Sequence, residues 1–96
     1  MLAGGLDRPE CSGQAFPRRV RRRFARAERL IDRAESATKT EKARHRLQRV
    51  ARLLEETFAG VDRLGKGGRI MADCAASLEV MLPEGERRAV ELASTL

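Results

Sequence analysis

The sequence contains no Trp, no Tyr and only three Phe among its 96 residues. Because β-sandwiches are rich in aromatic and β-branched residues, this composition argues against a β-sheet fold. No apolar run approaches the roughly 20 residues that a membrane-spanning helix needs, so membrane insertion is not expected. There is also no basic segment followed by the apolar stretch of a secretory signal, which leaves a cytosolic protein or a piece of a longer chain as interpretations. The length suffices for one small domain with a single core.

Residues that could perform catalysis or bind a metal are scarce. His45 is the only histidine, and its position between Arg44 and Arg46 predicts a solvent-exposed side chain. No Cys-x-x-Cys pair is present, and no Ser–His–Asp or Cys–His set can be identified. We therefore expect no catalytic activity, no cofactor and no bound metal.

One stretch has the spacing of a phosphate-binding loop, with Gly60 followed by Gly65-Lys66. Such a loop follows a strand and places Ser or Thr directly after the lysine. Here the stretch begins inside a helical pattern, and Gly67 occupies the position of the hydroxyl residue. We interpret the glycines as the end of a helix, because glycine accepts the left-handed angles of helix C-caps.

The charge is distributed unevenly along the chain. The net charge is +6, but residues 17–52 carry fourteen bases against four acids, whereas residues 53–96 carry five bases against eight acids. Such asymmetry is typical of a polyanion-binding surface, and equally of helices whose charges complement each other or a neighbouring chain.

Helical periodicity defines the first two helices. Pro17 marks the start of the first, and residues 36–39 form a break, where Thr38 and Glu41 fit a capping box for the second. The apolar positions of the first helix are Val20, Phe24, Ala27, Leu30, Ile31 and Ala34. Those of the second are Ala43, Leu47, Val50, Ala51, Leu53, Leu54, Phe58, Val61 and Leu64. Two long helices joined by a short turn run antiparallel.

A third helix follows Ile70. Its inward positions are Cys74, Leu78 and Met81. Pro83 interrupts the pattern, so residues 84–95 are expected either as a short fourth helix or as a kinked continuation. The inner face of this last segment would hold Val90, Ala93 and Leu96.

The sequence thus predicts an all-α fold. Residues 17–96 form a small three-helix bundle, with a short fourth helix after Pro83 as one alternative. Residues 1–16 show no periodicity and are expected to form a flexible N-terminal arm that is ordered only where something holds it.

The two cysteines lie far apart, with Cys11 in this arm and Cys74 in the third helix. One interpretation makes Cys74 a small core residue and Cys11 a free thiol. The other is a disulfide that attaches the arm to the bundle and implies an oxidising compartment. The spacing alone leaves both open.

Basic residues at the start of the first helix are the candidate polyanion-binding site. They are Arg18, Arg19, Arg21, Arg22, Arg23 and Arg26. The helix dipole disfavours positive charge there, so the end should fray, and a bound anion would relieve that cost. The bases of the second helix, Lys42, Arg44, Arg46, Arg49 and Arg52, do not form one face for reading nucleic acid. Because aromatic stacking residues are absent as well, a solvated charged face is the favoured interpretation.

Several motifs carry a resemblance. They are Arg26–Ala34 (RAERLIDRA), Lys42-Ala43, Leu53-Leu54, Gly65–Ile70 (GKGGRI) and Cys74–Leu78 (CAASL). In these motifs the segment from Phe24 to Leu82 resembles the FIMAH domains, short all-helical modules near the C-termini of large secreted or surface bacterial proteins. Met71 departs from the family, which usually has a Ser or Thr cap there.

The resemblance implies a non-enzymatic, extracellular accessory module. Similar modules often carry a cysteine upstream of the first helix and another at the start of the last, so the resemblance favours a disulfide between Cys11 and Cys74. We therefore expect a non-catalytic structural or interaction module of a secreted or cell-envelope protein, whose partner is another protein or its parent multidomain chain. The alternative is a small cytoplasmic protein that binds nucleic acid through the Arg-rich first helix.

Overall fold

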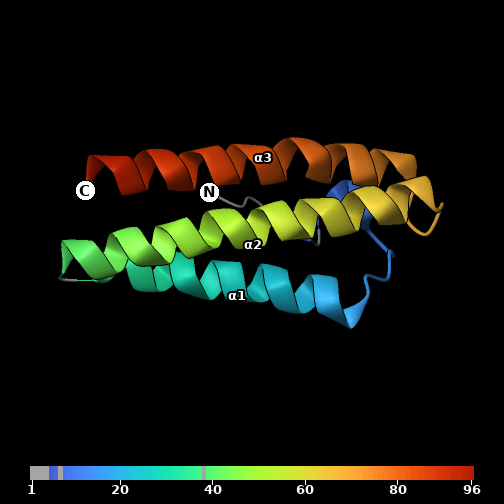
Figure 1. Cartoon of the computed structure of the whole chain (residues 1–96). Helices are drawn as coiled ribbons and strands as arrows, with labels where there is room; N and C mark the ends of the chain where they lie inside the picture. Colours follow the sequence, from blue (N-terminus) through green and yellow to red (C-terminus); the bar gives the residue numbers. More distant parts are fainter. Residues whose placement is uncertain (1–4, 7, 38) are drawn as a thin grey trace.

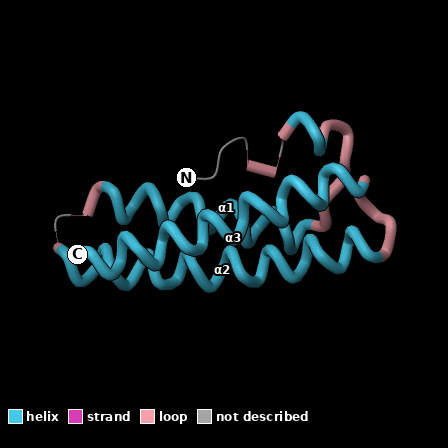
Figure 2. Tube along the Cα trace, turned by 90° about the horizontal axis from the view of Figure 1, so that it is seen from above, coloured by secondary structure: helices cyan, strands magenta, loops and turns pink. Residues whose placement is uncertain are grey.

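The computed structural model of the chain describes residues 5–6, 8–37 and 39–96. These residues form three helices, α1 (Arg18–Glu35), α2 (Thr40–Lys66) and α3 (Ala72–Thr95), preceded by one 3₁₀ turn, η1 (Pro9–Cys11). Helix α2 lies between the other two and runs antiparallel to both (Figure 1). The molecule measures 43 × 20 × 19 Å, and η1 stands at one end of it, as the view from above shows (Figure 2). The described residues contain no strand, so the predicted all-α fold is confirmed.

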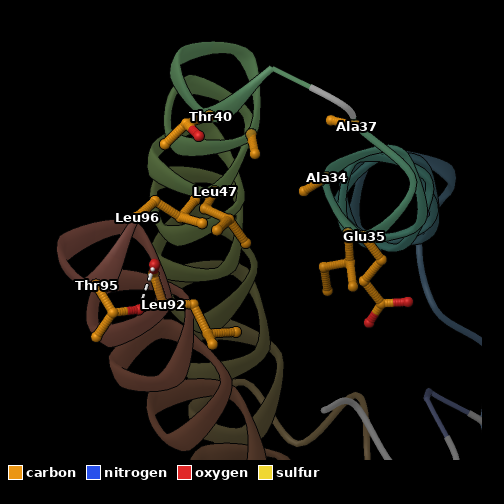
Figure 3. A pocket seen from close by; sticks show the side chains of 10 residues that line it. Ala34, Glu35, Ala37, Thr40, Leu47, Leu92, Thr95 and Leu96 are labelled. Carbon is orange, nitrogen blue, oxygen red and sulfur yellow. Dashed lines mark hydrogen bonds between the residues drawn. The ribbon is translucent and has the colours of Figure 1, made fainter.

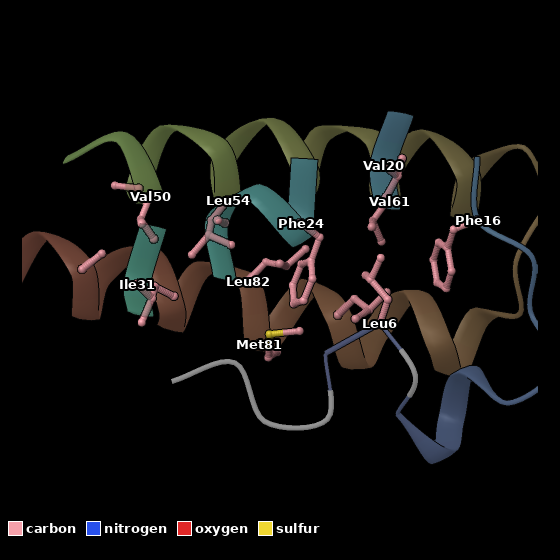
Figure 4. Close-up of a cluster of buried hydrophobic side chains, with 14 of the residues drawn as sticks. Leu6, Phe16, Val20, Phe24, Ile31, Val50, Leu54, Val61, Met81 and Leu82 are labelled. Carbon is pink, nitrogen blue, oxygen red and sulfur yellow. The ribbon is translucent and has the colours of Figure 1, made fainter. Parts of the chain in front are cut away.

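The buried face of α1 is the predicted one. All six apolar positions are buried, namely Val20, Phe24, Ala27, Leu30, Ile31 and Ala34. Pro17 is the N-cap residue, as expected. Phe24 reaches Met81 and Leu82 of α3 across the bundle (Figure 4). The helix thus contributes one continuous apolar stripe to the core.

Helix α2 buries a broader face than periodicity predicted, because it packs against two neighbours. Phe58 and Leu53 are only partly buried, whereas Thr57 and Gly60 are buried. The buried hydroxyl of Thr57 donates a hydrogen bond to the carbonyl oxygen of Leu53 at 2.7 Å, so no unpaired polar group remains there. The predicted capping box falls on Thr38, which lies outside the described residues, and the N-cap residue of α2 is Lys39.

The glycines of α2 allow close helix packing and end the helix. A Cβ atom at Gly60 would lie 3.1 Å from Val20 of α1, and one at Gly65 would lie 2.9 Å from the Cβ of Ala75 in α3. Gly68 adopts a φ of 71°, and the N–H of Arg69 donates to the carbonyl of Leu64 at 2.9 Å. This is the Schellman pattern of a helix C-terminus. Gly67 and Gly68 therefore form a helix end and not a phosphate-binding loop, whereas Gly60 and Gly65 lie inside α2.

Helix α3 continues through Pro83, so residues 84–95 form no separate helix. The expected inner face of this segment was therefore wrong at two of its three positions. Val90 is 53% exposed and Leu96 is 43% exposed. The helix instead buries Gly85, Ala89 and Ala93, which continue the register of the first half of α3 (Cys74, Leu78 and Leu82). Pro83 itself is exposed, and burial of the opposite face offsets the hydrogen bond that proline cannot make.

The N-terminal segment differs from the flexible arm that the sequence suggests. Of its described residues, 5–6 and 8–16, three are buried in the core: Leu6, Cys11 and Phe16. Leu6 lies beside Val61 of α2, and Phe16 lies further toward the C-terminal end of α2 (Figure 4). Periodicity could not predict this packing because the three apolar residues are five residues apart in a non-helical segment.

Candidate functional site

A disulfide joins the N-terminal segment to α3. The Sγ atoms of Cys11 and Cys74 are 2.04 Å apart, and their Cα atoms are 4.7 Å apart, across a sequence separation of 63 residues. Both cysteines are almost fully buried, at 3% and 0% exposure. Of the two interpretations of the cysteines, the structure therefore has the bonded pair.

Two further contacts hold the same end of the molecule together. The side-chain oxygen of Gln14 accepts a hydrogen bond from the backbone N–H of Met71 at 2.9 Å. Met71 is the N-cap residue of α3 and has no capping side chain of its own, so Gln14 satisfies a donor that helix formation leaves unpaired. The guanidinium of Arg21 lies 5.5 Å from the ring centre of Phe16, a cation–π contact between α1 and the N-terminal segment.

The six arginines predicted as a polyanion site have different surroundings. Arg18, Arg19, Arg22 and Arg26 are exposed around the first three turns of α1. Arg23 is 3.6 Å from a carboxylate oxygen of Glu56 in α2. With Arg21 placed over Phe16, two of the six side chains already have intramolecular partners.

The contacts between α1 and α2 follow one register. Arg23 faces Glu56, Val20 faces Gly60, and Arg46 donates a hydrogen bond to the carbonyl of Arg33 at 3.0 Å. The residue numbers in each contact add up to 79 or 80, as expected for one antiparallel register along the whole interface. This register places the C-terminal half of α1 beside the N-terminal half of α2, and both halves are rich in bases.

The result is a hollow that we call the basic groove. It has a volume of about 650 Å³. Its lining contains the basic side chains of Arg33, Lys42, Arg44, His45, Arg46 and Arg49, together with Leu30, Glu41 and Gln48. Lys42, Arg46 and Arg49 line this one hollow, but Arg52 is not in the lining and the guanidinium of Arg44 binds carbonyl oxygens of α3, so the five bases of α2 form no single face. His45 is exposed, as predicted.

The signal for this groove was present in the sequence but needed a partner helix. Lys42 and Arg49 are seven residues apart in α2. A spacing of seven residues returns to the same side of a helix after two turns. This spacing is unremarkable alone, and only the antiparallel pairing of α1 with α2 brings Arg33 to the same hollow.

A second hollow opens at the end of the bundle away from the disulfide (Figure 3). It has a volume of about 320 Å³ and lies between the C-terminal ends of α1 and α3 and the start of α2. Its apolar lining residues include Ile31, Leu47 and Leu92. Arg44 donates hydrogen bonds to the carbonyl oxygens of Ala93 and Leu96, which hold the end of α3 against α2.

The carboxylates of the described residues form no metal site. No group of three or more His, Cys, Asp or Glu side chains in this part of the chain could hold a metal ion.

Asp62 lies 2.9 Å from the ammonium of Lys66, and the hydrogen bond from Lys66 holds the pKa of Asp62 below its ordinary value of 3.8. The same contact raises the pKa of Lys66. None of the described helices is long and apolar enough to cross a membrane.

Searches of protein-family models, curated proteins and solved structures found no match to this chain. The resemblance to FIMAH domains therefore stays a prediction, and the function is argued from the geometry.

Proposed function

We propose that the chain is a non-catalytic helical interaction module of a secreted or cell-envelope protein. The observation that carries this proposal is the buried disulfide between Cys11 and Cys74. Structural disulfides persist in oxidising compartments and are rare in the cytosol, where thiols are kept reduced. A bond that fixes a 3₁₀ turn to the start of α3 serves the stability of a small domain.

The arrangement around the bond supports a structural rather than a redox role. Both cysteines are shielded from solvent, and the bond lies among packed apolar side chains. Reactive cysteines need at least partial exposure, because an attacking thiolate must reach the sulfur. The bond therefore serves to hold the N-terminal segment, and the exposed faces of the bundle are left for contact with a partner or with the parent chain.

A free-thiol count tests this proposal. Folded protein is equilibrated in glutathione buffer at a cytosol-like redox poise, and accessible and total thiols are then alkylated and counted by mass spectrometry. We expect no alkylated cysteine, since structural disulfides of secreted proteins resist this poise. Protein denatured in excess reductant is the control and must give two modified cysteines.

The same alkylation, applied to intact producing cells, gives the location. A pool with the disulfide formed, recovered in the envelope or medium fraction, supports the proposal. A cytosolic pool that carries two free thiols overturns it.

The second candidate function, nucleic-acid binding, is favoured by one observation, the basic groove between α1 and α2. It differs from the sequence-based version in its residues, because Arg33, Lys42 and Arg49 replace the arginines at the start of α1. It predicts duplex binding whose affinity falls steeply with salt.

A further inference from the structure

We propose that the basic groove binds a flexible, linear polyanion that carries phosphate or sulfate groups. This inference rests on the proposed function in that it takes the chain to be a binding module, and it names the ligand class of that module. The groove would hold the polymer by its charge alone, without recognising a base or a sugar.

The first support is the concentration of positive charge without acidic partners. Among the described residues, no carboxylate lies within 4.0 Å of Arg33, Lys42, Arg46 or Arg49. Glu41 is the only acid in the lining, against Arg33, Lys42, Arg46 and Arg49, because the guanidinium of Arg44 is bound to the carbonyls of Ala93 and Leu96. Like charges held close together repel one another. An anion bound in the groove would offset this repulsion, because each base is attracted to it.

The second support is the separation of charge around α1. Glu28 lies near the N-terminal segment, 4.0 Å from the position of a Cβ atom at Gly5. Glu35 lines a hollow with Glu84, Arg87 and other residues of α3. Glu28 and Glu35 thus lie away from the α2 side, whereas Arg33 lines the groove beside α2. No acid of α1 is among the lining residues of the basic groove.

The third support is the preset position of the arginines. Arg46 donates to the backbone carbonyl of Arg33 at 3.0 Å, which holds one guanidinium in the groove before any ligand arrives. Guanidinium groups bind phosphate and sulfate oxygens through two parallel N–H donors, so a preset orientation lowers the entropy lost on binding.

The shape of the groove favours a single flexible strand. A flexible single chain can lie along a hollow of about 650 Å³, whereas a rigid nucleic-acid duplex can contact only its rim. The lining contains no aromatic side chain on which a base could stack. A polymer recognised by the spacing of its anionic groups fits both features.

Three triple variants with equal loss of charge test the proposal. The groove variant is R33Q/K42Q/R49Q, which leaves Arg46 and its hydrogen bond in place. The first control, R69Q/R87Q/R88Q, changes exposed bases of the α2–α3 loop and α3. The second control, R18Q/R19Q/R22Q, changes the start of α1. Each variant lowers the formal net charge from +6 to +3. Circular dichroism melting verifies that all three fold.

Binding is measured by fluorescence anisotropy over a range of salt concentrations with four probes: inorganic polyphosphate, heparin, single-stranded DNA and duplex DNA. We expect the wild-type chain to bind the three single-chain polymers more tightly than the duplex. The groove variant should lose roughly tenfold or more in affinity at low salt, with the slope of log affinity against log salt smaller by about two units. The two controls should each change affinity less than about threefold.

Three results would overturn the proposal. The first is no binding of the wild-type chain to any single-chain polymer at 50 mM salt, a condition chosen as roughly low ionic strength for such contacts. The second is an equal loss in all three variants, which would make the attraction a property of net charge. The third is a preference for duplex DNA, which would assign the surface to double-stranded nucleic acid. The thiol count decides the compartment and this titration decides the ligand, so either can fail alone.

Discussion

Breaking the bond between Cys11 and Cys74 should cost this protein about 4 kcal/mol of its free energy of unfolding. The bond closes a loop with a sequence separation of 63 residues. In the chain-entropy account, the cross-link stabilises the fold by restricting the unfolded chain, and the effect grows with the logarithm of the loop length. Small domains have a total stability of roughly 5–15 kcal/mol, so the bond supplies a large share of it.

The double substitution C11A/C74A isolates this effect. Both sites are buried, and alanine removes each Sγ atom, keeps the Cβ as a methyl group and adds no polar atom. Under oxidising conditions the double variant loses the cross-link and a little packing. Under reducing conditions the wild-type chain loses the cross-link too, so the two proteins should then differ only by the small packing term.

Thermal unfolding followed by circular dichroism measures the difference. For a domain of this size, 4 kcal/mol corresponds to a lowering of the Tm by roughly 15–30 °C. We expect this lowering between the oxidised wild-type chain and the double variant, and only a few degrees between the reduced wild-type chain and the double variant. If reduction leaves the wild-type Tm unchanged, the bond does not stabilise the fold and the reasoning is refuted.

Other predictions concern packing and charge. Gly65→Ala should lower the free energy of unfolding by about 1–3 kcal/mol because its methyl group would meet Ala75 Cβ, which only a helix shift can relieve. Gly60→Ala should change it by less than about 1 kcal/mol because the helix propensity gained offsets a contact with one movable methyl group; urea denaturation decides, and equal losses would contradict the close approach of α2 and α3. Val90→Gln should leave the free energy of unfolding nearly unchanged, whereas Ala89→Gln should lower it by more than about 2 kcal/mol in the same assay. The reverse order would mean that Val90, and not Ala89, faces the core after Pro83. The pKa of Asp62 is lowered by folding, so the stability it contributes is present at neutral pH and is lost only as pH falls below 3.8. An NMR titration of the Asp62 carboxyl carbon should give a midpoint below that value, and Lys66→Met should return it to the ordinary range.

Local patterns predicted much of the helical framework because each pattern depends on neighbours within a few turns. The buried stripe of α1 follows from the repeat of apolar residues at 3.6-residue spacing, which is a property of one helix. The end of α2 follows from Gly67 and Gly68, since the C-terminal hydrogen bonds of a helix involve only its last turn. The same kind of reasoning failed at Val90. Local sequence shows that Pro83 destabilises a helix, but it does not show that the packing of α3 against α2 offsets this cost and keeps the helix in one register.

The candidate sites depended on residues that are distant in the sequence. Cys11 can bond to Cys74 only because the folded chain brings the N-terminal segment, whose Leu6 and Phe16 are buried, against the bundle. The basic groove requires the antiparallel register that places Arg33 beside Arg46. The sequence by itself therefore determined where helices form and which stripe of α1 is apolar. Which face each helix shows its neighbours was decided by the tertiary structure, because packing of whole faces selects one register among several that local propensities allow equally well.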